Sequence, residues 1–111
     1  MRLKTLVILF LFAGSAGMAF AQLSPEYADW MEQPQGYLLT DDEKKEWKDV
    51  DTDQEAKKFI ELFWARRNPK PEAAINEFKA RFEGMVKYCD ENFSYEGRRG
   101  ALSDMGKVFL L

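Results

Sequence analysis

Carboxylates are the groups in this sequence with the widest scope for chemistry. The chain has 111 residues, including 19 aspartates and glutamates and no histidine. Two carboxylates facing each other can hydrolyse a glycosidic bond, one as the acid and the other as the nucleophile or base. Glu61, Glu91 and Asp104 are candidates for such a pair, and their spacing leaves open whether any two of them meet. A carboxylate-type hydrolase is therefore one interpretation of the chain.

The absence of histidine removes other classes of site from this chain. Neither a Ser-His-Asp nor a Cys-His arrangement can form within it, and the commonest metal ligand is missing. Cys89 is the single cysteine, so no disulfide can form inside the chain. It lies on an apolar stripe with helical spacing, and we expect a buried thiol that does not react.

An acidic cluster between Asp49 and Glu55 alternates like the ligands of a calcium loop. It lacks the central glycine and the distant glutamate of such a loop. Thr40 and Thr52 are each followed three residues later by a glutamate, which is the pattern of a helix-capping box. Helix caps explain the cluster better than a metal does. We therefore predict no catalytic residue, no metal site and no cofactor.

Arg67 is the basic residue most in need of a partner. It lies one helical turn beyond Phe63, on an apolar face, where an unpaired charge is costly. Asp104, a short acid in a glycine-flanked turn, is our first choice of partner. We predict that Arg67 and Asp104 face each other.

Three further residues are candidates for a structural or interaction role. Trp64 lies at one edge of the apolar face of the second helix. Arg98 and Arg99 lie in a glycine-flanked loop, where they either contact an acidic partner or remain in solvent.

Three amphipathic helices should position these residues. Capping boxes start the first helix after Thr40 and the second after Thr52, and Asn68-Pro69 ends the second. The third starts at Pro71 or just after it. Its apolar stripe comprises Ile75, Phe78, Phe82, Met85, Cys89 and Phe93. From the two strongest stripes we predict a central core of Phe59, Phe63, Phe78 and Phe82.

A glycine-rich turn and an apolar strand over Lys107–Leu111 are expected to follow the helices. The predicted class is α+β, mostly helical. A single strand has no ladder partner, which favours a domain shortened at its C-terminus.

The N-terminus has the layout of a secretory signal peptide over residues 1–21, with basic, apolar and small-residue regions in order. Cleavage there would remove two of the 16 basic residues and leave 14 against 19 acidic ones, a net charge of −5. We expect an exported protein, periplasmic or extracellular, with no membrane anchor after cleavage. Nucleic acid is a poor partner for so acidic a chain. Residues 22–36 should form an irregular arm before a domain over residues 37–111.

Four sequence segments together resemble the GWxTD domain of exported bacterial proteins. They are YLLTDDEKKEWKDVDTDQEAKKFIELFWARRNPKP, NEFKARF, DENFS and RRGALSDMGKVFLL. The resemblance covers Tyr37 to Leu111 and places the family signature on Gly100 to Asp104, with Ala101 at the tryptophan position and Ser103 at the threonine position. The family pattern continues beyond the point matched by Leu111. The resemblance implies export and a shared fold, and it transfers no catalytic residue, because the role of the family is uncharacterised.

We therefore expect a non-enzymatic interaction module of the cell envelope. Its partner would be another envelope protein, bound for example by strand addition at Lys107 to Leu111. The alternatives are the hydrolase described above and a truncated, non-functional copy of a longer GWxTD protein.

Overall fold

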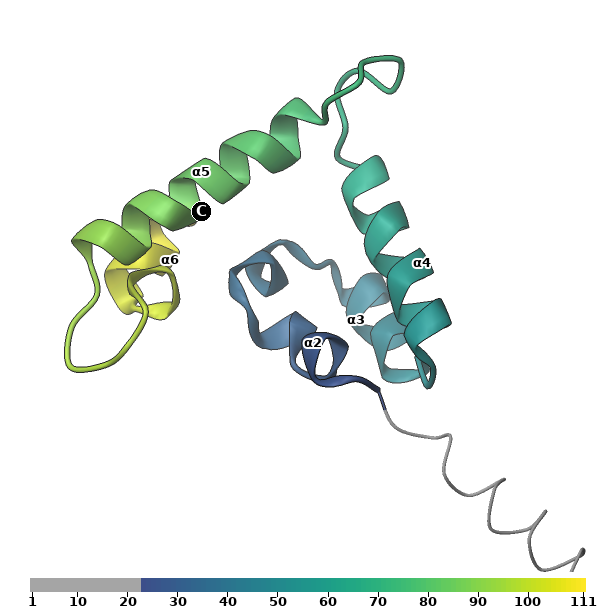
Figure 1. Ribbon diagram of the computed structural model, residues 1–111, viewed down its shortest axis with the longest axis horizontal. Helices are drawn as coiled ribbons and strands as arrows, with labels where there is room; N and C mark the ends of the chain where they lie inside the picture. The colour runs from purple at the N-terminus through teal and green to yellow at the C-terminus, as the bar shows by residue number, and fades with distance from the viewer. Residues whose placement is uncertain (1–22) are drawn as a thin grey trace, which may run out of the picture.

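The computed structural model describes residues 23–111, and within that range every regular element is a helix (Figure 1). The elements, with η marking short 3-10 helices, are α2 (Pro25–Ala28), η1 (Trp30–Glu32), η2 (Pro34–Leu38), α3 (Asp41–Lys48), α4 (Asp53–Ala65), α5 (Glu77–Asn92), η3 (Gly100–Leu102) and α6 (Asp104–Leu110). The predicted signal peptide lies outside the described residues. None of the helices described is long and apolar enough to cross a membrane.

The predicted C-terminal strand is wrong, because the chain from Asp104 to Leu110 is helix α6. The side chain of Ser103 caps this helix by accepting a hydrogen bond from the Gly106 amide at 3.0 Å. Leu110 is buried against Phe82, Cys89 and Ala101. The helix therefore buries apolar surface that a lone strand would leave in water. The α+β class is therefore corrected to all-helical for residues 23–111, and strand addition loses its basis.

Both predicted capping boxes are confirmed. The Thr40 hydroxyl accepts from the Glu43 amide at 3.2 Å, and the Glu43 carboxylate accepts from the Thr40 amide at 3.0 Å. Thr52 and Glu55 repeat the arrangement at the start of α4. Each box satisfies two amides that a helix start leaves free.

The third helix begins later than predicted. The cap of α5 is Asn76, whose side chain accepts from the Lys79 amide at 3.1 Å and donates to the Trp64 carbonyl at 2.9 Å. Asn76 therefore fixes where α5 starts relative to the end of α4. The connecting segment (residues 69–75) is exposed and non-helical, and it includes Ile75, which is 68% exposed instead of part of the core.

The apolar side chains form two clusters instead of one central core. The first consists of Trp30, Leu39, Trp47, Ala56, Phe59 and Phe63. The second consists of Phe82, Cys89, Ala101 and Leu110. We call residues 23–68 the N-terminal lobe and residues 77–111 the C-terminal lobe. Phe59, Phe63 and Phe82 are buried as predicted, but in different lobes, and Phe78 is only partly buried.

The segment predicted to be an irregular arm contributes a central residue to the first cluster. The ring of Trp30 lies 5.1 Å from those of Trp47 and Phe63 and 5.8 Å from that of Phe59. Its contact with Phe63 is edge-to-face, an arrangement that adds to simple burial. The short helices α2 and η1 therefore belong to the N-terminal lobe.

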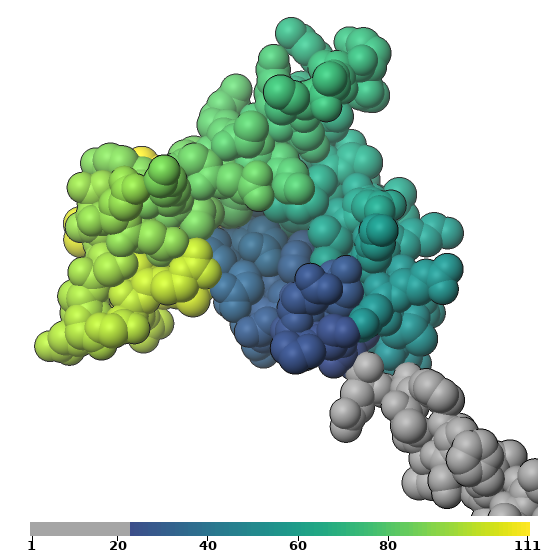
Figure 2. Space-filling view, viewed as in Figure 1, coloured from purple at the N-terminus to yellow at the C-terminus, as the bar shows by residue number. Residues whose placement is uncertain are grey.

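The two lobes meet through a few contacts. In Figure 2 the surface of the N-terminal segment, in blue, lies between α4 and the C-terminal lobe. The Tyr37 hydroxyl donates to the Ala101 carbonyl at 3.2 Å, and the ring of Trp64 lies 6.0 Å from that of Phe82. Arg99 adds a hydrogen bond to the side chain of Gln33. Trp64 and Leu38 each pack against both clusters and so form the apolar link between them.

Two glycines allow the C-terminal lobe to pack closely. A Cβ atom on Gly100 would lie 1.8 Å from the Cys89 carbonyl oxygen, and one on Gly106 would lie 1.9 Å from the Gly100 carbonyl oxygen. Both of these oxygens belong to the backbone and cannot move away by a side-chain rotation. The helices α5, η3 and α6 therefore approach each other only because these positions have no side chain.

Candidate functional site

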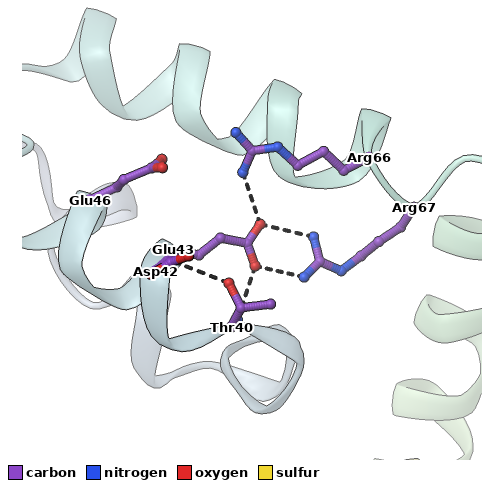
Figure 3. A pocket seen from close by; sticks show the side chains of 6 residues that line it. All are labelled: Thr40, Asp42, Glu43, Glu46, Arg66 and Arg67. Atoms are coloured by element: carbon purple, nitrogen blue, oxygen red, sulfur yellow. Dashed lines mark hydrogen bonds and ion pairs between the residues drawn. The ribbon is translucent and has the colours of Figure 1, made fainter.

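Arg67 pairs with Glu43 and not with Asp104, which corrects our prediction. Its two terminal nitrogens donate to the two oxygens of Glu43 at 2.7 and 3.1 Å. The same nitrogens donate to the carbonyls of Phe63 at 2.8 Å and Leu38 at 2.9 Å. Figure 3 shows the guanidinium and the carboxylate facing each other between α3 and the end of α4. The capping role of Glu43 places it at the start of α3, in the same lobe as Arg67, whereas Asp104 lies on α6 in the C-terminal lobe.

Glu43 is almost fully enclosed, with 4% of its surface exposed. The hydrogen bonds from Arg67 lower the pKa of this carboxyl to about 2, outweighing the opposing effect of burial. The Thr40 amide and Arg66, at 3.2 Å from Glu43, contribute in the same direction. Glu43 is therefore ionised throughout the neutral range.

The chemistry available to this cluster is limited. A general acid needs a pKa near the working pH, and that of Glu43 lies far below neutrality. Both of its oxygens already accept hydrogen bonds from the chain. The open depression beside it is lined by Asp42, Glu46 and Arg66 as well. We interpret the Glu43–Arg67 pair as a structural clamp between α3 and α4.

Arg99 is held by its own chain. It donates to Asp90 at 2.8 Å and to Gln33 at 2.9 Å. Asp90 also accepts from the Ala101 amide at 3.0 Å. The hydrogen bond from Arg99 is the main reason that the pKa of Asp90 is lowered. Arg99 therefore ties the loop before η3 to α5 and to the N-terminal lobe.

The remaining predicted site residues lie apart. Arg98 is exposed and donates to the Leu102 carbonyl at 3.2 Å. Asp104 is exposed in the first turn of α6. Trp64 is partly buried at the junction of the lobes, with the ammonium of Lys79 5.6 Å from its ring centre. The five candidates do not form one site, although Trp64 and Arg99 line one depression between the lobes.

The three carboxylates considered for hydrolysis lie on different helices. Glu61 is on α4, Glu91 on α5 and Asp104 on α6, and all three are exposed. Within residues 23–111 no group of acidic or cysteine side chains is arranged to hold a metal ion.

An exposed apolar surface covers one side of the C-terminal lobe. Phe109 of α6 stacks on Tyr88 of α5, with ring centres 5.1 Å apart and planes inclined by 20°. Beyond this stack on α6, Val108 is 79% exposed and Met105 65%. Met105 also lines a depression together with Tyr95. We call this surface the C-terminal apolar face and define it as Tyr88, Tyr95, Met105, Val108, Phe109 and Leu111.

Helix α6 is apolar on both its inner and its outer side. Gly106 and Leu110 pack inward, while Met105, Val108 and Phe109 face outward. A surface helix normally has one apolar stripe that faces the core and a polar opposite side, so the apolar residues on the outer side of α6 are unusual. Sequence reasoning missed this surface because it predicted a strand over Lys107–Leu111. The signal that would have revealed it is the helical spacing from Met105 to Val108, behind the serine cap.

Comparisons of the chain with protein-family models, curated proteins and solved structures gave no match.

Proposed function

We propose that this protein is a non-enzymatic module that binds a protein partner through its C-terminal apolar face. The observation that carries the proposal is the outer side of α6, where Val108 and Met105 are 79% and 65% exposed beside the Tyr88–Phe109 stack. Contiguous apolar patches of this kind on soluble proteins mark interaction sites. Covering one such side chain completely is worth roughly 1.5 to 3 kcal/mol. A partner that covers several of these side chains would therefore gain a substantial binding free energy.

The stacked aromatic pair supports a protein partner. Tyrosine and phenylalanine are enriched in the cores of protein interfaces, because they bring large area with few rotatable bonds. The ring centre of Phe109 also lies 6.0 Å from that of Phe93, so its ring packs against two other rings. A rigid anchor of this kind loses little conformational entropy when a partner covers it.

The cell envelope is the proposed location. The support is the signal-peptide pattern of residues 1–21 and the resemblance of residues 37–111 to the GWxTD domain of exported bacterial proteins. The excess of acidic residues favours a protein over nucleic acid as the partner.

Site-specific photo-crosslinking in the source cells tests the proposal. A photoreactive phenylalanine analogue is placed at Val108 in one variant and at Leu62 in another. Leu62 is the matched control, because it is an exposed apolar residue (46%) on a helix of the other lobe. We expect a discrete adduct from position 108 and none from position 62. Equal labelling at both positions, or none at position 108, would refute the proposed interaction face.

A further inference from the structure

The net charge of the described chain is confined to one lobe. Residues 23–68 hold seven basic and 12 acidic residues, a net charge of −5. Residues 77–111 hold six of each sign, so the C-terminal lobe is neutral. The C-terminal apolar face belongs entirely to the neutral lobe.

We propose that a second copy of this chain covers the C-terminal apolar face, forming a two-fold symmetric dimer. This inference rests on the proposed function, which it deepens by naming the partner. Two copies of a neutral lobe approach each other without net repulsion, whereas two N-terminal lobes repel. A two-fold dimer through the C-terminal lobes therefore brings two neutral surfaces together and keeps the acidic N-terminal lobes out of the interface.

The charges on the C-terminal lobe favour a second copy of this lobe over a partner with a large net charge. On α6 itself, Asp104 and Lys107 are both exposed and lie one turn apart. A helix with one charge of each sign can offer each of them an opposite charge when it packs against its own copy in the antiparallel direction. A strongly acidic or basic partner would meet an equal number of like and opposite charges and gain nothing from them.

The size of the face is consistent with a dimer. Its six side chains are between 43% and 79% exposed. Aromatic side chains bury roughly 150 to 250 Å² each, and the three aliphatic ones are somewhat smaller, so the exposed part is on the order of 100 Å² per residue and 600 Å² in all. A standard stable interface buries about 800 Å² per partner, including its polar rim. The apolar face and its rim are therefore close to what one dimer interface requires.

The Tyr88–Phe109 stack offers aromatic surface to a second copy. The rings of Tyr88 and Phe109 are nearly parallel, inclined by 20°. In a two-fold interface each residue meets its own equivalent or exchanges contacts symmetrically. The outer surface of such a stack can pack on the same surface of the second copy.

Sedimentation equilibrium of the purified protein over a range of concentrations tests the inference. We expect a monomer–dimer equilibrium with twice the chain mass at the upper limit. Val108→Glu should raise the dimer dissociation constant at least about tenfold. The matched control is Leu62→Glu, which adds the same charge to an exposed apolar position of the N-terminal lobe and should leave the constant unchanged. Thermal unfolding of both variants checks that neither change disturbs the fold.

Two outcomes would overturn the dimer. One is a protein that remains monomeric at every concentration, and the other is equal weakening by the two substitutions. The crosslinking experiment separates this failure from failure of the proposed function. An adduct from position 108 with twice the chain mass supports the second copy, while an adduct with a different protein, from a chain that is monomeric, refutes the dimer and retains the interaction module. A monomer that gives no adduct refutes both.

Discussion

The guanidinium of Arg67 spans both oxygens of the buried Glu43 carboxylate, at 2.7 and 3.1 Å. The side chain of Arg67 is 17% exposed, and that of Glu43 is 5% exposed. Removing one partner leaves a largely shielded charge without its counter-ion, which is costly. The pair joins the start of α3 to the end of α4, and its stability is the basis of the first two predictions.

Removing either partner of this pair should be strongly destabilising. We expect Glu43→Gln or Arg67→Met to lower the free energy of unfolding by roughly 3 kcal/mol. Glu43→Gln leaves the guanidinium of Arg67 without its carboxylate, and Arg67→Met leaves the enclosed carboxylate with only the more exposed Arg66 as its ion-pair partner. The double variant should lose little more, giving a coupling energy above about 1 kcal/mol in urea unfolding. The control cycle combines Arg67→Met with Asp104→Asn and should be additive. Coupling in the control cycle but not in the Glu43 cycle would contradict the observed pairing.

The protein should lose stability in acid, in part through Glu43. Its pKa is about 2 in the folded chain and has an ordinary value of about 4.3 when unfolded. A lowered pKa stabilises the fold fully above the unfolded value, and this contribution disappears as pH falls from about 5 to about 2. The loss is roughly 3 kcal/mol.

The pH dependence is measured by urea unfolding at a series of pH values. Asp90, whose pKa is lowered mainly by Arg99, also contributes to the slope of the wild-type protein. The difference between wild type and Glu43→Gln isolates the share of Glu43, because the variant keeps Asp90. Parallel curves for the two proteins would show that Glu43 does not titrate as proposed.

Two glycines of the C-terminal lobe should respond to alanine in opposite ways. Gly100→Ala places a methyl group 1.8 Å from a backbone oxygen of α5, and we expect a loss of more than about 2 kcal/mol. Gly84 lies in the middle of α5 with nothing within 4 Å of the added atom. Gly84→Ala should therefore stabilise the helix by up to about 1 kcal/mol. Thermal unfolding of both variants measures the difference, and a tolerated Gly100→Ala would contradict the close packing.

Cys89 should be protected from thiol reagents in the folded protein. Its side chain is fully buried, and burial is the main cause that raises its thiol pKa, with Asp90 adding to it. Only the thiolate reacts, so both effects slow modification. We expect labelling at mildly alkaline pH to be at least about tenfold slower in buffer than in denaturant. Similar rates in both would indicate that the C-terminal lobe opens readily.

The helices were predictable where their ends carry chemical signals. Thr40 and Thr52 fixed the starts of α3 and α4, because a capping box depends on residues only three positions apart. The start of α5 was placed too early, because Pro71 is suitable for a first helical position but Asn76 is the residue that caps. Asn76 also donates to the Trp64 carbonyl, twelve residues away in the sequence, and this tertiary contact could not be read from the local pattern.

The tertiary partners were not predictable. Arg67 was known to need a carboxylate, but the chain offers 19 of them, and only the fold brings Glu43 to it. The outer side of α6 was missed for a different reason. A short apolar run such as Val108–Leu111 suits a strand and a helix equally, and periodicity alone does not separate them. The helical conformation is favoured because it packs Leu110 against Phe82 and Cys89 of α5.

The two apolar clusters have a consequence for how the chain folds. Each cluster is built from a continuous stretch of sequence, and residues 69–75 separate them. Most contacts of each buried cluster are therefore local in sequence, which favours rapid folding. During synthesis the stretch that ends at Asn68 is complete before α5 has been made. Trp64, at the end of the first stretch, then offers the apolar surface on which the second stretch docks.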